Sequence, residues 1–212
     1  MARTTLAGLA LTFALLVPTG WVAYDGVAPT ATPPRVRPLA PGRPGELVVV
    51  PGRSRAFGRG DVLRFSVEIE GGLRVRRAKV AARVTTVLAD PRSWGLAVRR
   101  VSSGPTDVRV ILARPATTDR LCAPLQTNGL FSCAQSDRVV LNAARWLGGA
   151  KPYGRALRRY RVYMVNHEIG HVLGHGHAGC SGTGRAAPVM MQQTKGLGGC
   201  RPNPWPLAWE RG

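Results

Sequence analysis

Apolar residues first gather in an uncharged segment near the N-terminus. After Arg3 the next charged residue is Asp25, so residues 4–24 form a 21-residue uncharged window with an almost continuously apolar centre. A window of this length can cross a bilayer. We therefore predict that residues 1–26 are either a signal anchor, which is an N-terminal transmembrane helix, or a signal peptide, which is a cleaved signal sequence. In both cases this segment exports the rest of the chain.

An uncleaved anchor is favoured over a cleaved peptide. Signal peptidases prefer small side chains at the third and first positions before the cut. A cut after Ala23 would place the large Trp21 at the third position, and a cut after Ala28 would put Pro29 immediately downstream. We expect the chain to be attached to a membrane with its domain extracytoplasmic, the alternative being a secreted protein.

Residues 27–45 are rich in proline and poor in apolar side chains. Such a composition favours an extended, semi-rigid spacer. The prolines are Pro29, Pro33, Pro34, Pro38, Pro41 and Pro44. We predict that residues 46–212 form a single domain.

Within this domain, hydrophobic positions follow first the two-residue period of strands and then the spacing of helices. In residues 62–69 apolar side chains alternate with others before two glycines. Residues 78–89 and 154–173 carry apolar residues at helical spacing, and Gly174 ends the second run. The predicted strands are 47–50, 62–69, 96–101, 108–112 and 138–144, with an irregular stretch before the last of them and a loop-rich C-terminal end. This order predicts an α+β fold, a mixed sheet with helices packed against it.

The charge of the chain first suggests a polyanion partner. The net charge is +19, but only Lys79, Lys151 and Lys195 are lysines, so 27 of the 30 basic residues are arginine. The basic residues are spread along the chain, without a basic tail and without the interleaved aromatics of nucleic-acid binders. Nucleic acid is therefore not expected as the main partner, whereas anionic polymers of the cell envelope are compatible with a basic exported surface.

The four cysteines agree with export. An even number of cysteines in an exported domain predicts disulfides, and four cysteines allow three pairings. Pairing of nearest neighbours, Cys122 with Cys133 and Cys180 with Cys200, closes two short loops and is favoured. A cysteine zinc cluster is disfavoured because the sequence has no C-x-x-C pair.

The four histidines lie within eleven residues, in the order H-E-x-x-H-x-x-G-x-x-H. His167 and His171 are four residues apart, so on a helix they point at one metal ion. Gly174 can turn the chain so that His177 becomes the third ligand. Three neutral imidazoles leave a fourth position for water, as in catalytic zinc sites. Glu168, which has no cation nearby in the sequence, is the expected base for the zinc-bound water.

His175 is an alternative third ligand. It is four residues after His171, so a helix that continued past Gly174 would bring it to the metal. Gly174 and Gly176 argue against such a helix, which favours His177.

The motif H167-E168-x-x-H171-x-x-G174-x-x-H177 resembles the extended zinc signature of the metzincin metallopeptidases. These enzymes also have a Met-turn, whose methionine lies under the zinc without binding it. The resemblance identifies A187-P188-V189-M190-M191 as this turn, with Met190 preferred. From R138-V-V-L-N-A to A-P-V-M-M-Q-Q-T the sequence is also similar to a family of uncharacterised exported actinobacterial domains of metzincin type.

The resemblance implies one Zn²⁺ per chain and hydrolysis of protein or peptide substrates, which lie antiparallel to an edge strand. Residues 138–144 are the candidate edge. Some metzincins have a tyrosine just after the Met-turn, but all four tyrosines here precede the zinc-binding histidines, so none is expected in that role. The side chains after Met191, namely Gln192, Gln193 and Thr194, are polar and their roles stay open. The alternative function is a non-proteolytic zinc-binding or cell-wall-acting domain of the envelope.

Overall fold

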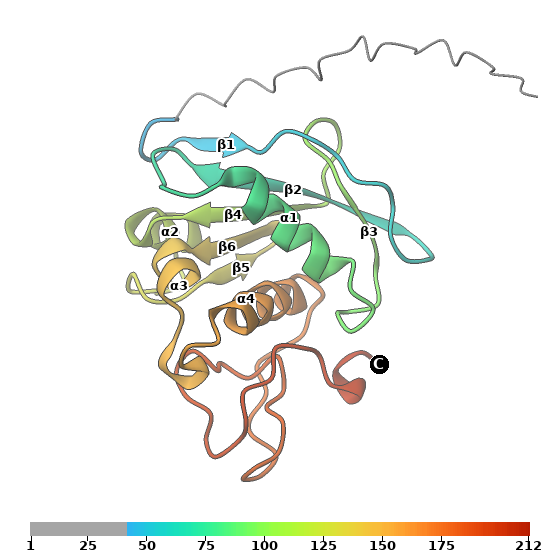
Figure 1. Ribbon diagram of the computed structural model, residues 1–212, viewed down its shortest axis with the longest axis vertical. Coiled ribbons are helices and arrows are strands. Elements are labelled where there is room, and N and C mark those ends of the chain that lie inside the picture. Colours follow the sequence, from blue (N-terminus) through green and yellow to red (C-terminus); the bar gives the residue numbers. More distant parts are fainter. Residues whose placement is uncertain (1–41) are drawn as a thin grey trace, which may run out of the picture. The chain divides into compact units, whose positions relative to one another are not determined.

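The computed structural model describes residues 42–212 (Figure 1). The second predicted strand, with its alternating residues, pairs with three other strands of one sheet. The predicted membrane segment 1–26 and residues 27–41 of the predicted spacer lie outside the described residues. At the end of the spacer, the Gly45 N–H donates to the Glu70 carboxylate at 2.9 Å. No helix in residues 42–212 is long and apolar enough to cross a membrane.

The described sheet has six strands and is mixed, as predicted. Parallel pairs join β2 to β3 and β4, and β4 to β6, whereas β1 and β5 pair antiparallel to their neighbours. The order is β1-β2-β4-β6-β5, and β3 pairs with the first half of β2. The strands are β1 Leu47–Val49, β2 Val62–Glu70, β3 Ala97–Arg100, β4 Val108–Ala113, β5 Cys133–Gln135 and β6 Arg138–Asn142.

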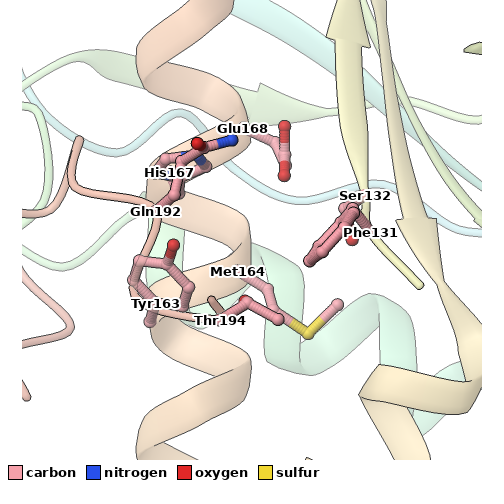
Figure 2. Close-up of a pocket in the computed structure, with 8 residues that line it drawn as sticks. All are labelled: Phe131, Ser132, Tyr163, Met164, His167, Glu168, Gln192 and Thr194. Carbon is pink, nitrogen blue, oxygen red and sulfur yellow. The ribbon is translucent and has the colours of Figure 1, made fainter. Parts of the chain in front are cut away.

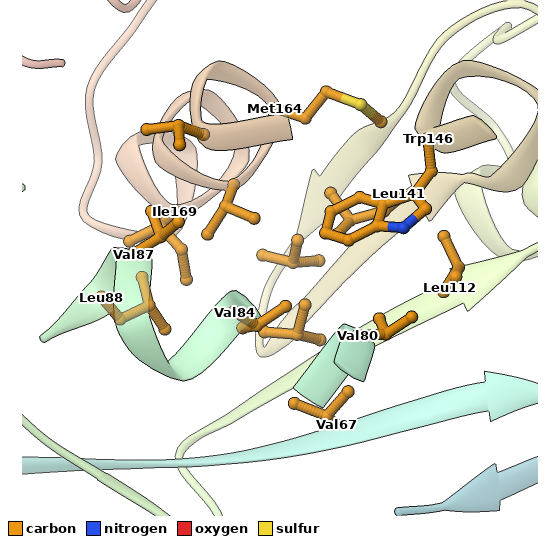
Figure 3. Close-up of a cluster of buried hydrophobic side chains, with 14 of the residues drawn as sticks. Val67, Val80, Val84, Val87, Leu88, Leu112, Leu141, Trp146, Met164 and Ile169 are labelled. Carbon is orange, nitrogen blue, oxygen red and sulfur yellow. The ribbon is translucent and has the colours of Figure 1, made fainter. Parts of the chain in front are cut away.

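Four α-helices pack around this sheet, so the predicted α+β class is confirmed. They are α1 Arg77–Leu88, α2 Pro115–Cys122, α3 Ala143–Gly148 and α4 Leu157–Val172, with short 3₁₀ turns at Lys151–Tyr153 and Ala208–Glu210. The main core lies between one face of the sheet and helices α1 and α4 (Figure 3). Val84 of α1 and Ile169 of α4 are both fully buried in it. The helices predicted from apolar spacing in residues 78–89 and 154–173 are therefore confirmed as α1 and α4.

The two faces of β2 have different roles. Phe65, Val67 and Ile69 point into the main core, as the alternation predicts. The other face carries Glu68 and Glu70, which are both buried against arginines of β4 and of its C-terminal end. The Arg109 guanidinium donates to both oxygens of Glu68 at 2.7 Å, and the Arg114 backbone and side chain donate to Glu70 at 2.6 and 2.8 Å.

The structure differs most from the sequence predictions at three places. The last predicted strand ends at Asn142 rather than at residue 144, because the Asn142 side chain accepts the Ala144 N–H at 2.9 Å and caps α3. The stretch predicted to be irregular contains α2 and β5, each too short to show a clear period. The long helix begins at Leu157 rather than at residue 154, after a 3₁₀ turn that Gly154 ends at a φ of +50°.

The prediction that residues 138–144 form the edge strand is wrong. β6 lies between β4 and β5, so its hydrogen-bonding groups are used on both sides. β5, the three-residue strand before it, is the edge on this side of the sheet. The polar turn at residues 136–137 connects β5 to β6, so β5 occupies the side of β6 that would otherwise be an edge.

Both predicted disulfides are confirmed. Cys122 at the end of α2 is bonded to Cys133 at the start of β5, with Cα atoms 6.1 Å apart. Cys180 is bonded to Cys200, with Cα atoms 5.8 Å apart. The second bridge closes the loop that follows the histidine motif.

Candidate metal centre

The three histidines favoured as ligands lie together. His167 and His171 project from α4, and His177 returns to them from the loop after it. One nitrogen from each imidazole lies within 4.8 Å of the others, and the Nε2 atoms of His171 and His177 are 3.1 Å apart. Two nitrogens bound tetrahedrally to zinc lie about 3.4 Å apart. The described residues therefore contain a group that can hold a metal ion.

Backbone carbonyls orient the two helical imidazoles. Nδ1 of His167 lies 2.8 Å from the Val189 carbonyl oxygen, and Nδ1 of His171 lies 2.9 Å from that of His175. A carbonyl can only accept, so each Nδ1 carries the proton and each Nε2 keeps a free lone pair. Burial lowers the pKa of His167 to about 3 and also lowers the pKa of His171 and His177. All three are therefore neutral at pH 7, the form that binds a metal.

Gly174 makes the predicted turn. It has a φ of +90°, in the left-handed region. The Gly174 N–H donates to His171 O at 3.0 Å, and the His175 N–H donates to Gly170 O at 2.9 Å. These two bonds form a Schellman motif, which ends α4 and reverses the chain. The sequence inference that the helix stops at this glycine is confirmed.

His175 lies outside the histidine group. Its ring stacks on Trp94, with centroids 4.5 Å apart and an angle of 17° between the planes. Its backbone carbonyl, rather than its side chain, serves the site by orienting His171. Among the described residues the group consists of His167, His171 and His177, which supports the choice of His177 over His175.

Met190 lies in a turn that supports two of the three histidines. Its neighbour Val189 supplies the carbonyl for His167, and the Met190 carbonyl accepts the N–H of Ala178, the residue after His177. The Met190 side chain is buried and packs on α4 at Gly170, where a Cβ would lie 2.3 Å from the sulfur. Gly170 is therefore needed inside the helix because Met190 occupies the space of a side chain.

Glu168 is buried on α4 and lines the same cleft as the histidines. Figure 2 shows its carboxylate pointing from the helix toward the side of Ser132 and Phe131. Burial raises the pKa of Glu168 to about 8. A bound dication would stabilise the carboxylate and oppose this shift. The cleft has a volume of about 470 Å³, and it reaches from the histidines to β5 and to Lys195.

The three described tyrosines hold the loop after Met190 in place. Tyr153, Tyr160 and Tyr163 contact Gln193, Thr194 and the Met191 carbonyl through their hydroxyl groups. Gln193, whose role the sequence left open, is fully buried, while Gln192 and Thr194 line the pocket beside His167.

Sequence reasoning missed two residues that support the site. Gly170 carries a recognisable signal, a glycine inside a predicted helix. Glu210, the third residue from the end of the sequence, carries none. It is buried, and its carboxylate accepts the N–H groups of Val189, Met190 and Leu207 at 2.8–2.9 Å.

Two comparisons with known proteins bear on this site. The chain matches none of the curated proteins with which it was compared. Residues 42–204, about three quarters of the chain, match a family described as "Protein of unknown function (DUF3152)". The matched segment contains the three histidines, Glu168, Met190 and all four cysteines. The chain belongs to this DUF3152 family.

Proposed function

We propose that this protein is a zinc-dependent metallopeptidase of metzincin type that acts outside the cytoplasm. The observation that carries the proposal is the convergence of His167, His171 and His177 beside the buried Glu168 in one cleft. Met190, the methionine that the metzincin resemblance selects, lies in the turn that supports His167 and the residue after His177. The two disulfides support an extracytoplasmic location.

The donor set fits zinc. Three neutral imidazoles suit a borderline metal such as Zn²⁺ and do not suit Mg²⁺ or Ca²⁺, which prefer oxygen ligands. Glu168 is not one of the ligands, so the fourth position of a tetrahedral zinc ion stays open. His167, His171 and His177 would hold the ion, and the carbonyls of Val189 and His175 would keep two of the rings in place.

Glu168 would move the proton during hydrolysis. Zinc, when bound, polarises the peptide carbonyl and makes water a stronger nucleophile at neutral pH. Glu168 takes a proton from the attacking water as the water oxygen bonds to the carbonyl carbon. It then gives that proton to the leaving nitrogen as the C–N bond breaks. Its burial keeps bulk water from competing for the proton.

Substrate would bind along β5. Cys133 and Ala134 line the cleft, and β5 pairs with β6 on one side only. An extended peptide can add to such an edge through main-chain hydrogen bonds. Because β5 has three residues, this edge would engage a short stretch of peptide next to the metal.

The test uses purified full-length protein. We expect one zinc per chain, cleavage of a proteome-derived peptide library, and loss of cleavage after chelation. Glu168→Gln should keep zinc and lower turnover at least a hundredfold. His177→Gln should lose zinc, whereas the matched His175→Gln should keep it because that side chain lies outside the histidine group.

Each outcome bears on a different part of the proposal. Equal zinc loss in the two histidine variants would contradict the ligand set. Full cleavage by Glu168→Gln would contradict the proton-transfer role. Zinc binding with no cleavage of any library peptide would contradict the peptidase assignment and favour an envelope domain that acts on cell-wall fragments or does not cleave at all.

A further inference from the structure

We propose that a basic groove beside α1 and α4 binds a linear polyanion through the phosphates of its backbone. Two adjoining hollows of about 420 and 450 Å³ share Arg83 and Arg158 and together form this groove. The first hollow lies between α1, the end of α3 and the start of α4. Its cations are Arg74, Arg76, Lys79, Arg83, Arg158 and Arg161.

No carboxylate lines either hollow. Arg109 and Arg114 at the sheet have acidic partners, Glu68 and Glu70 respectively, and Arg92 of the second hollow is paired with Asp90 at 2.7 Å. In the first hollow, by contrast, Arg161 has a like charge close by: burial and the charge of Arg83 both lower the pKa of its guanidinium. The first hollow therefore holds unneutralised positive charge, which a bound anion would stabilise.

The positions of these cations are unfavourable for the helices themselves. The first turns of α1 and α4 contain Lys79 and Arg158 respectively, and neither first turn contains an acidic residue. The N-terminal end of a helix is positive, so cations in the first turn reduce helix stability. A bias toward arginine in the whole chain explains the number of cations but not the exclusion of acids from this groove. Anion binding explains both the exclusion and the unfavourable positions.

The groove also holds its guanidinium groups in place before a ligand binds. The Arg161 Nε donates to the Trp146 carbonyl at 2.7 Å, and its guanidinium lies 5.3 Å from the Trp146 ring centroid. Among the described residues, Nε is the nitrogen of the Arg161 guanidinium that has a hydrogen bond, so the two terminal nitrogens can bind phosphate oxygens. In the second hollow, Arg159 donates to the Pro202 carbonyl at 3.2 Å. Arginines fixed in this way lose little side-chain entropy on binding.

The groove favours backbone phosphates over nucleic-acid bases. Its two tryptophans already have guanidinium partners, Arg161 on Trp146 and Arg92 on Trp205 at 4.3 Å. Bases of single-stranded nucleic acid bind by stacking on free aromatic faces. A concave groove also suits a linear chain better than a flat bilayer. The ligand class is therefore a linear phosphate polymer without bases.

This site is separate from the metal centre. None of the residues that line the two hollows lines the cleft at the histidines. Binding of the polymer should therefore depend on neither zinc nor Glu168. The proposal stands even if the peptidase assignment fails.

The test compares two triple variants of the full-length protein that remove the same charge. The groove variant is Arg76→Gln, Lys79→Gln and Arg158→Gln, all at exposed positions. The control variant is Arg53→Gln, Arg59→Gln and Arg99→Gln, also exposed and outside the groove. The probe is end-labelled linear inorganic polyphosphate, and its binding is followed by fluorescence anisotropy at several salt concentrations.

We expect the groove variant to bind polyphosphate at least tenfold more weakly at 150 mM salt and to lose about 2 from the log–log salt slope, since each lost phosphate contact contributes about 0.7. The control variant should bind within about twofold of the parent. Both should keep their zinc content and melting temperature. Equal weakening in both variants would overturn the site, because it would reflect net charge alone. Tighter groove-dependent binding of single-stranded DNA or phosphatidylglycerol vesicles would overturn the ligand class.

Discussion

The carboxylate of Glu210 accepts the backbone N–H of Met190 at 2.9 Å. Its other oxygen accepts the N–H groups of Val189 and Leu207 at 2.9 and 2.8 Å. The same turn supplies the carbonyl that orients His167. A residue near the end of the chain is therefore linked, through one backbone turn, to a candidate metal ligand.

Replacement of Glu210 should weaken the metal site. In Glu210→Gln an NH₂ group replaces one of the two accepting oxygens, so a buried N–H loses its acceptor. We expect the unfolding free energy to fall by about 1–3 kcal/mol and zinc affinity to fall about tenfold. Chelator competition measures the affinity, and denaturant unfolding measures the stability. The exposed Glu46→Gln is the control; equal zinc affinity in both variants would contradict the link.

Gly170→Ala should destabilise the packing between α4 and Met190. The new Cβ would lie 2.3 Å from the Met190 sulfur and 2.6 Å from Trp94 Cζ2. Overpacking of this kind costs about 1–3 kcal/mol. Gly176→Ala is the matched control, because a Cβ there meets nothing within 4 Å. Thermal unfolding of the two variants separates them, and a Gly170→Ala protein as stable as the control would refute the packing argument.

The two disulfides should differ in their effect on zinc. Replacing either cysteine pair by alanine should lower stability by about 3 kcal/mol, because each bridge closes a short loop. The Cys180–Cys200 loop contains Met190 and begins three residues after His177, whereas the Cys122–Cys133 loop contains no candidate ligand. Only the Cys180→Ala/Cys200→Ala protein should therefore bind zinc more weakly. Equal zinc affinities in the two double variants, measured by chelator competition, would show that the bridge does not position His177.

Glu70 should make stability depend on pH in the acid range. Burial raises its pKa, but hydrogen bonds from the Arg114 and Gly45 backbones and from the Arg114 side chain outweigh burial, so the pKa lies below its usual value of 4.5. A carboxyl with a lowered folded-state pKa stabilises the fold above its unfolded pKa, and this contribution is lost as the pH falls through the folded value.

Glu70→Gln should accordingly reduce the loss of unfolding free energy between pH 5 and pH 3, the range about the usual carboxyl pKa. Urea titrations at several pH values measure this slope. Asp61→Asn, at an exposed position before β2, is the control. A parent-like slope in Glu70→Gln would show that the buried ion pair with Arg114 does not control acid stability.

The sequence by itself determined the features that depend on local spacing. The four-residue spacing of His167 and His171, the helix end at Gly174 and the alternation in β2 follow from chain geometry over a few residues, and the structure agrees with each. The structure also has the nearest-neighbour disulfides, which the sequence favoured among three pairings because they close the shortest loops. Short elements were missed because α2 and β5 span too few residues for a period to appear.

Only the tertiary structure decided which distant groups meet. It placed β5 rather than β6 at the sheet edge, brought Glu210 to the turn at Met190, and gathered the cations of α1 and α4 in one groove without a carboxylate. These relationships join residues that are separated along the chain and follow no local period. They depend on how the helices and loops pack on the sheet, and local spacing carries no information about that packing.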